Sequence, residues 1–392
     1  MARRRARHPD SMRQYIMHLH AKREWGSELP RCRQQDPERI GYESTGASTM
    51  ARHLELGLDT FGDVTRGSDG TLVPYPQVIR NVIEEAVLAD EVGIDFFGVG
   101  EHHRDDFAIS APETVLAAIA GRTSRIRLGS AVTVLSSDDP VRVYQRFATL
   151  DAASNGRAEV ILGRGSFTES FPLFGFELSQ YEELFEEKLG LFAELLKEEP
   201  VNWSGRTRPG LTDHRVYPPT ESGRLKTWIG VGGSPESVVR AARYGMPLML
   251  AIIGGEPARF APYVDLYHRA LGQLGQPSLP IGVHSPGYIA DSDEQAREEL
   301  WPDNRILRDR IGAERGWGPT TRAEFDAEAD GGSLYVGSPE TVARKIAATA
   351  TTLGIDRFDM KYSAGPLPHD KLMHSIELYG TKVIPMVREL LA

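Results

Sequence analysis

Cysteine is nearly absent from this sequence: Cys32 is the only one among 392 residues. A single cysteine excludes an internal disulfide and is typical of proteins from a reducing cytoplasm, which is where we expect this chain to work. Long apolar runs are also lacking, since the longest, around 246–253, is far too short to cross a bilayer. We therefore expect a protein without a disulfide framework and without a membrane partner.

An excess of basic residues is lacking as well. The chain has 45 Lys and Arg against 55 Asp and Glu, which gives a formal net charge of −10 and a pI near 5.6. Nucleic-acid-binding proteins need a basic face for the phosphates, so the composition argues against such a partner. What the chain does have, 40% hydrophobic and 26% charged residues, is typical of a soluble globular protein with an ample core.

Residues 1–50 differ from the rest of the chain. They are rich in arginine and show no sustained apolar periodicity. An export signal would need an apolar segment after its arginines, and this region does not supply one. We predict a disordered extension at 1–50, followed by a folded domain at 51–392.

From His53 onward, apolar runs of strand length alternate with helical patterns of apolar residues. Such alternation predicts a parallel sheet, open or closed. Because the loops are short and no break in composition divides the chain, we favour a closed (β/α)8 TIM barrel with insertions over an open doubly wound sheet. No GxGxxG motif follows the first strand, which weakens the open alternative. The predicted strands span 53–59, 95–99, 126–135, 158–163, 227–231, 247–253, 281–290, 333–336 and 357–362.

Two stretches of this pattern are irregular. Residues 202–223 are rich in Pro and Gly and predict a loop excursion, and residues 292–330 are polar and predict an insertion with short helices. Binding residues are often found on such loops, so we expect substrate contacts in 62–75, 167–180 and 302–330.

Small residues mark the third and fourth predicted strands. Gly129, Ser130 and Ala131 lie inside the third, and the segment 163–166 ends the fourth. Small residues let a flat ligand lie against the backbone, and an arginine between glycines, Arg164, can reach an anion.

The fifth predicted strand is followed by a helix start, with Ser234 as N-cap and proline next to it. Strands four and five are neighbours in a barrel, so Arg164 and Ser234 should lie on one rim and form a phosphate site. The general rule for barrels points instead to the last strands, near Ser338, where the same Gly-Ser-Pro-Glu pattern recurs. We favour the first location, because only there does the topology supply an arginine.

His102 and His103 follow the second predicted strand. Adjacent residues on an extended chain point in opposite directions, so we expect no metal site here, which disfavours a metal-dependent hydrolase. One histidine can face the barrel mouth as acid, base or hydrogen-bond donor while the other packs outward; a structural role for both is the alternative. Four phenylalanines within 167–176 predict packing in the core or in a lid. The less favoured interpretation is that they form a wall of a ring-binding pocket.

Four motifs occur in a fixed order: LGLDTFGD (56–63), GVGEHH (98–103), the segment 127–166 and VGGSPESV (231–238). In order and spacing they resemble the bacterial luciferase-like family of flavin-dependent monooxygenases and oxidoreductases, and within it an uncharacterised branch of probable oxidoreductases. The resemblance implies a (β/α)8 barrel that holds reduced FMN or, in some branches, the deazaflavin F420. It also implies a non-proline cis peptide under the flavin ring, at Ala131–Val132.

The resemblance implies roles for individual residues as well. The active-site histidine of the family corresponds to His102, its phosphate-binding arginine to Arg164, and its helix-start serine and threonine to Ser234 and Ser237. Gly163 replaces the reactive cysteine of the light-emitting members, so luminescence is not expected. Together with the strand-end rule, this predicts His102 and His103 as catalytic residues and, as cofactor contacts, Asp59, Ala131, Val132, Arg164, Gly165, Ser166, Gly233, Ser234 and Ser237.

From this resemblance we expect an FMN-dependent monooxygenase that uses reduced flavin and O2 on a small organic substrate. A separate reductase would supply the reduced flavin, since the chain has no dinucleotide-binding fingerprint. F420-dependent hydride transfer and a flavin-binding protein without turnover are the alternatives. A homodimer is consistent with the family.

Overall fold

The computed structural model describes residues 53–165 and 167–392. The predicted extension at 1–50, Cys32 within it, and the predicted cofactor contact Ser166 lie outside the described residues. In the part of the chain that is described, no helix is both long and apolar enough to reach across a membrane.

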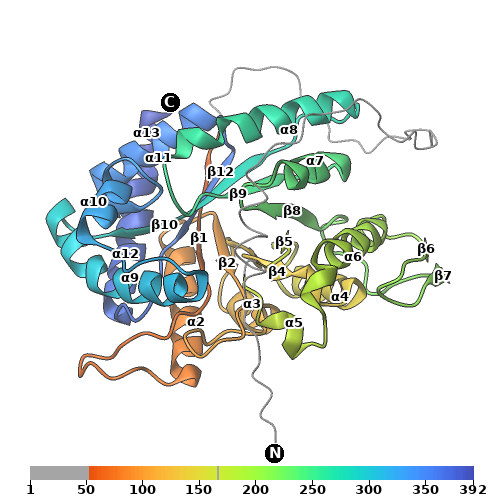
Figure 1. Cartoon of the computed structure of the whole chain (residues 1–392), viewed down its shortest axis with the longest axis horizontal. Coiled ribbons are helices and arrows are strands. Elements are labelled where there is room, and N and C mark those ends of the chain that lie inside the picture. The colour runs from red at the N-terminus through yellow and green to blue at the C-terminus, as the bar shows by residue number, and fades with distance from the viewer. Residues whose placement is uncertain (1–52, 166) are drawn as a thin grey trace, which may run out of the picture. The chain divides into compact units, whose positions relative to one another are not determined.

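Eight parallel strands form a closed barrel with helices around it, as predicted (Figure 1). They are β1 (Glu55–Thr60), β2 (Phe96–Val99), β3 (Arg127–Ser130), β5 (Ala158–Gly163), β8 (Lys226–Val231), β9 (Leu248–Ala251), β10 (Ile281–Ile289) and β12 (Arg357–Lys361). Each pairs with the next, and the last closes on the first: Gly57 of β1 lies opposite both Phe96 of β2 and Asp359 of β12. This closure excludes the open doubly wound sheet.

The sequence predicts nine strands, one more than the barrel holds. The extra strand is β11 (Tyr335–Gly337), which pairs only with the end of β10, from Gly287 to Ile289. The predicted third strand is divided in two: β3 ends at Ser130, and β4 (Thr133–Val134) follows on the other side of Ala131–Val132 and pairs with the end of β5.

The α-helices are α2 (Tyr75–Glu91), α3 (Pro112–Ala120), α4 (Pro140–Ala153), α5 (Ser170–Leu173), α6 (Tyr181–Leu195), α7 (Pro235–Arg243), α8 (Ala261–Gln273), α9 (Asp293–Arg315), α10 (Arg322–Asp330), α11 (Pro339–Leu353), α12 (His369–Leu378) and α13 (Ile384–Leu390). Three of them begin as their sequences indicate. Asp139 accepts hydrogen bonds from the N–H groups of Val141 (2.9 Å) and Arg142 (3.2 Å) at the start of α4. Ser234 and Ser338 cap α7 and α11 in the same way, each followed by proline.

Both irregular stretches contain more regular structure than predicted. Residues 202–223 overlap an antiparallel hairpin of β6 (Val201–Trp203) and β7 (Leu211–His214), which lies at the periphery next to α6 (Figure 1). The prediction of short helices in 292–330 is right for α10 and wrong for α9, which runs for 23 residues. Most of α9 is polar and Pro302 lies inside it, so the local signal for one long helix is weak.

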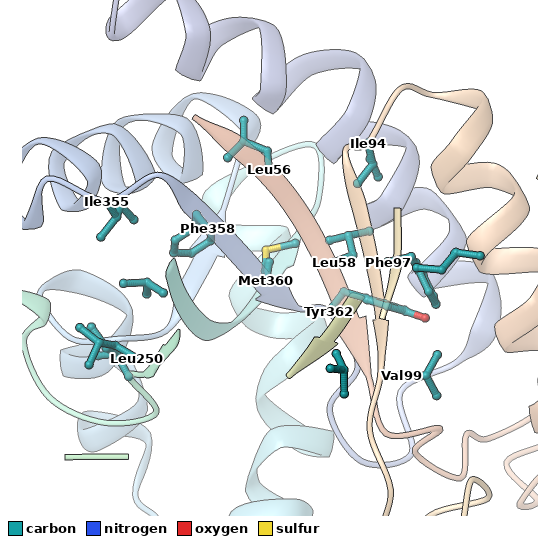
Figure 2. Close-up of a cluster of buried hydrophobic side chains, with 14 of the residues drawn as sticks. Leu56, Leu58, Ile94, Phe97, Val99, Leu250, Ile355, Phe358, Met360 and Tyr362 are labelled. Atoms are coloured by element: carbon teal, nitrogen blue, oxygen red, sulfur yellow. The ribbon is translucent and has the colours of Figure 1, made fainter. Parts of the chain in front are cut away.

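Side chains alternate between the outside and the inside of the barrel along each strand. Leu56 and Leu58 of β1 belong to the outward set, which packs between the strands and the helices (Figure 2). The same figure labels further outward residues: Phe97 and Val99 of β2, Phe358 and Met360 of β12, and Tyr362, which directly follows β12. The residues between them, such as Gly57 and Asp59, therefore face the interior of the barrel.

The barrel interior has three levels. At the amino ends of the strands lies a buried ion pair of Arg357 and Glu159. The middle level is an apolar cluster of Phe96, Ile161, Trp228 and Met249. The level at the carboxyl ends lines the mouth and contains mostly small and polar residues, and it holds the candidate site.

Candidate functional site

One half of the mouth, at β2, β3, β5 and β8, is poor in side chains. There the Ala131–Val132 segment, whose peptide bond is cis, lies against glycines of neighbouring strands. A Cβ added to Gly98 would lie 2.9 Å from Cβ of Ala131, and one added to Gly163 would lie 2.5 Å from Cγ2 of Val132. On β8, a Cβ added to Gly230 would lie 3.2 Å from Cγ1 of Val132. We call this half the low floor, because its glycines keep the segment close to the backbone of the strands.

Gly129 does not belong to the low floor. A Cβ there would meet the ring of Phe96 at 2.8 Å, so the missing side chain makes room for the middle level of the interior. Ser130 is fully buried, and its hydroxyl donates to the carbonyl of Ile161 (3.1 Å). Of the small residues in the third predicted strand, only Ala131 therefore reaches the mouth.

A cationic cluster of Arg164, Arg240, Ser234 and Ser237 borders the low floor at the ends of β5 and β8. Arg164 forms an ion pair with Glu182 of α6, and the other oxygen of that carboxylate accepts a hydrogen bond from Arg240 of α7 (3.1 Å). Arg240 also donates to Oγ of Ser237 (3.3 Å), whose N–H is capped by Oγ of Ser234 (3.3 Å). The structure thus brings Arg164, Ser234 and Ser237 together, with an anion between two guanidinium groups.

Two predicted contacts, Gly165 and Gly233, flank this cluster with φ angles of 84° and 115°, a region that favours glycine. A Cβ at Gly165 would lie 2.8 Å from Cγ1 of Val134, and the carbonyl of Gly233 accepts a hydrogen bond from the hydroxyl of Tyr263 (2.8 Å). Both backbones are therefore held in place beside the cluster, and side chains are excluded at both positions.

The start of α11, the alternative phosphate position, is occupied by the protein itself. Asp293 accepts hydrogen bonds from the N–H of Ser338 (2.6 Å) and from Oγ1 of Thr341 (2.9 Å). Burial raises the pKa of Asp293, but these hydrogen bonds outweigh it and hold the pKa below its usual value. A carboxylate of the protein therefore occupies both places, but only Glu182 is held by two arginines, which a phosphate can bind in its place.

His102 and His103 contact different carboxylates. Nδ1 of His102 lies 3.4 Å from Oε1 of Glu169, and Nε2 of His103 lies 3.2 Å from Oε2 of Glu101. Burial raises the pKa of Glu169, but hydrogen bonds from His102 and from the backbone of His103 bring it below its usual value. The other oxygen of Glu101 accepts the N–H of Val134 (2.6 Å), which ties His103 to β4. Within residues 53–165 and 167–392, no three His, Cys, Asp or Glu side chains are grouped to hold a metal ion.

His102 lies in an aromatic enclosure. Its ring centroid is 4.7 Å from that of Phe61 and 4.6 Å from those of Phe107 and Phe167. The predicted cluster after the fourth strand therefore divides, since Phe167 joins this enclosure whereas Phe171 is fully buried in the protein. An apolar enclosure keeps water away from a group that holds or moves a proton.

Sequence reasoning missed Glu182, Arg240 and a histidine, His284 of β10. Asp59, a predicted cofactor contact, is buried at the end of β1, and its Oδ2 lies 2.7 Å from Nδ1 of His284. Arg240 lies three residues after Ser237 on one helix, so helical spacing could have indicated it. The partner of Asp59 is 225 positions away and becomes visible only when the barrel is closed.

Residues 60–357, more than half of the chain, match the model of the luciferase-like monooxygenases. The chain belongs to this family. One relative is the alkanal monooxygenase alpha chain of Photobacterium leiognathi, which is 24% identical over 344 residues, covering 80% of this chain and 95% of the relative. The family comprises oxidoreductases, which agrees with the resemblance seen in the motifs.

Solved structures share the fold. The oxygenating constituent of 3,6-diketocamphane monooxygenase from Pseudomonas putida, in complex with FMN, gives a TM-score of 0.69 at 20% identity, covering 85% of this chain and 98% of that one. An F420-dependent secondary alcohol dehydrogenase, in complex with an F420–acetone adduct, gives a TM-score of 0.67 at 16% identity, covering 86% and 99%. In these two structures one fold serves two different cofactors.

Proposed function

We propose that the protein is an FMN-dependent monooxygenase, which uses reduced flavin and O2 to oxidise a small organic substrate. One observation carries the proposal: the cationic cluster lies beside the low floor, and both are on the side of the mouth formed by β5 and β8. FMN combines a flat ring system with one phosphate group. It therefore needs a seat free of side chains and an anion site close to it.

The residues present fit such a cofactor. The ring system would lie over Ala131 and Val132, and the phosphate would lie among Arg164, Ser234 and Ser237. Charge-assisted hydrogen bonds already hold the carboxylate of Glu182 there, and a phosphate requires the same chemistry. When bound, reduced flavin supplies the electrons that activate O2.

In this proposal His102 holds the proton that an oxygen atom at the reacting centre receives. Glu169 orients its ring through Nδ1, and the aromatic enclosure excludes water. His103, bonded to Glu101, holds the end of β2 against β4 and so acts as a positioning residue.

F420-dependent hydride transfer is the second candidate. The fold shared with an F420-dependent secondary alcohol dehydrogenase favours it, and the cationic cluster can bind a phosphate of either cofactor. A flavin-binding protein without turnover would bind FMN and oxidise nothing. The leading proposal has three further parts: a separate flavin reductase supplies the reduced flavin, the protein works in the cytoplasm, and it forms a homodimer.

Titration with FMN, riboflavin and F420, followed by fluorescence, tests the cofactor. We expect Arg164→Met to weaken FMN binding about 10- to 100-fold, because a hydrogen bond to a charged group contributes about 1.5–3 kcal/mol. Riboflavin lacks the phosphate, so its affinity should not change. Arg142→Met is the control, since the side chain of Arg142 is exposed on α4 and, within the described residues, donates a hydrogen bond only to Gln145.

Three outcomes would change the proposal. Preference for F420 over FMN would favour hydride transfer, and binding of neither cofactor would refute both enzyme proposals. FMN binding without oxidation of any substrate would favour the binding protein. The first substrates to try with reduced FMN and O2 are an alkanal and a bicyclic ketone, after the names of one relative and one protein of the same fold. A native mass spectrum of the loaded sample reports the subunit number.

A further inference from the structure

The half of the mouth opposite the low floor is polar, and the function proposed above leaves its histidine unused. Nδ1 of His284 lies 2.7 Å from Oδ2 of Asp59. The side chain of Asp59 is 1% exposed and that of His284 is 14% exposed. Because an ionised carboxylate can only accept, Nδ1 carries the hydrogen in this pair, and Nε2 of the neutral ring has none.

The side chain of His284 projects into the mouth. On β10 it lies two residues after Gly282, where an added Cβ would meet Met249 of the middle level at 2.5 Å. Residues two apart on a strand share a face, so His284 lies above that packing. Its neighbours in register are Ala251 of β9 and Asp359 of β12. Among the described residues, Nε2 has no hydrogen-bond partner and is not enclosed, so a ligand in the mouth can reach it.

His284 and His102 are separated by one aromatic ring. The centroid of Phe61 is 6.5 Å from that of His284 and 4.7 Å from that of His102. Both histidines have a carboxylate at Nδ1, Asp59 in one case and Glu169 in the other. The mouth therefore contains two imidazoles that are oriented in the same manner, close enough to serve one bound molecule.

The charge behind His284 limits what it can bind. Oδ1 of Asp59 and both carboxylate oxygens of Asp359 are buried and have no partner in the described part of the chain. Burial raises the pKa of Asp359 well above its usual value; Arg357 counteracts this in part, and the charge of Asp59 adds to it. Asp59 then supplies the negative charge that stabilises a positive imidazole ring. A substrate anion would be repelled here, whereas a neutral oxygen group would not.

We propose that His284 is a second catalytic residue of the mouth, which exchanges a proton through Nε2 with a hydroxyl or carbonyl oxygen of a neutral substrate. Asp59 is its positioning residue. When Nε2 takes a proton from a substrate hydroxyl, the O–H bond breaks, an N–H bond forms, and Asp59 balances the charge of the ring. In reverse, the N–H bond breaks and the proton goes to the oxyanion that a carbonyl group becomes when a nucleophile adds to its carbon. The proposal rests on the proposed function for the oxidation itself, and it assigns Asp59 to the histidine rather than to the cofactor.

The position of the ring hydrogen tests the pair without any substrate. In long-range ¹H–¹⁵N spectra of protein labelled on histidine, assigned with His284→Gln and His284→Asn, we expect the neutral His284 ring to carry its hydrogen on Nδ1. Asp59→Asn should shift the hydrogen toward Nε2, because the asparagine amide can donate to Nδ1. Glu85→Gln is the control and should leave the His284 ring unchanged. Glu85 contacts another histidine outside the barrel, with its Oε1 2.7 Å from Nδ1 of His369. A wild-type ring with its hydrogen on Nε2, or one that Asp59→Asn leaves unchanged, would overturn the proposal.

Turnover then tests the catalytic role. With the alkanal or ketone that reacts faster, His284→Gln should lower kcat about 100- to 10,000-fold, the usual contribution of an acid–base residue. FMN affinity should stay within about twofold of the wild type. His369→Gln should leave turnover unchanged, and near-wild-type turnover in His284→Gln would refute the role. If the wild type binds no flavin, the proposed function fails, but the hydrogen position still decides whether Asp59 orients His284.

Discussion

Carboxyl groups are buried in two parts of the barrel interior, at the amino ends of the strands and nearer the mouth, but all of their oxygens have partners in only one of these parts. At the amino ends, Arg357 is fully buried and donates to Glu159 (2.8 Å) between the rings of Phe96 and Trp228, whose centroids lie 4.4 and 4.7 Å away. Glu159 also accepts a hydrogen bond from Nε1 of Trp228 (2.8 Å). Arg357 and Glu159 therefore each have an oppositely charged partner.

Nearer the mouth, Asp59 at the end of β1 and Asp359 in the middle of β12 leave three buried oxygens unpaired among the residues described. The pKa values follow the same division. Burial raises the pKa of Glu159, but Arg357 and Lys226 outweigh it and hold the pKa far below its usual value. At Asp359 burial dominates and the pKa is raised. Unpaired buried polar groups cost stability, so we expect the paired groups at the amino ends to stabilise the fold more than the unpaired carboxyl groups nearer the mouth.

The largest effect should come from breaking the ion pair at the amino ends. Glu159→Gln would leave the guanidinium of Arg357 buried without its main counter-charge and should cost about 3–5 kcal/mol in the free energy of unfolding, measured with urea. Glu55→Gln is the control, because Glu55 pairs with the same arginine but its side chain is 33% exposed. It should cost about 1 kcal/mol. Equal losses in the two variants would contradict the assignment of Glu159 as the main partner.

A smaller effect should come from removing one hydrogen bond at the same end. Trp228→Phe keeps an aromatic ring on Arg357 but removes the N–H that Glu159 accepts. We expect a loss of about 1 kcal/mol in the same urea experiment, the usual net contribution of a hydrogen bond. A much larger loss would show that the volume of the indole, rather than its N–H, supports this level.

The smallest effect should come from the unpaired carboxyl groups nearer the mouth. Asp359→Asn replaces a protonated carboxyl with an amide of the same shape, so at pH 5 its free energy of unfolding should lie within about 1 kcal/mol of the wild type. In the wild type, the pKa of Asp359 is higher in the folded state than in the unfolded state. When the pH is above the pKa of the unfolded state, the folded protein therefore binds more protons than the unfolded protein. Stability should therefore fall as the pH rises from about 4 toward the folded pKa.

Asparagine does not ionise, so Asp359→Asn should lack this part of the pH dependence and become the more stable protein at pH 8. Urea unfolding at pH 5 and pH 8 measures the difference directly. A variant that loses stability equally at both values would mean that Asp359 is ionised and paired in the folded protein, and the contrast between the two parts of the interior would disappear.

Local signals predicted most of the architecture. Asp139, Ser234 and Ser338 are N-caps because a short polar side chain before a proline can accept a backbone N–H, which needs no information from elsewhere in the chain. The signal is weak where a helix is polar and contains a proline, as in α9, and where a hairpin has only three and four residues per strand, as in β6 and β7. These elements depend on tertiary contacts more than on local pattern.

The candidate site was predictable where topology alone decides neighbours. Strands that follow one another in a barrel end on one rim, so the proximity of Arg164 and Ser234 follows from the order of strands. Glu182 could not be inferred, because it comes from α6, and the way a helix packs over the rim depends on the lengths of the connections. The roles of these residues in cofactor binding stay a prediction.

The sequence by itself determined the alternation of strands and helices and the helix starts, because each depends on contacts within a few residues. It also shows where small residues lie, but what these residues pack against depends on neighbouring strands. Only the tertiary structure decided that His284 meets Asp59 and that Glu182 lies between two arginines. The physical reason is that closing the barrel and packing its helices brings together side chains from distant segments. Which of them meet depends on strand register and helix position, which the local pattern does not specify.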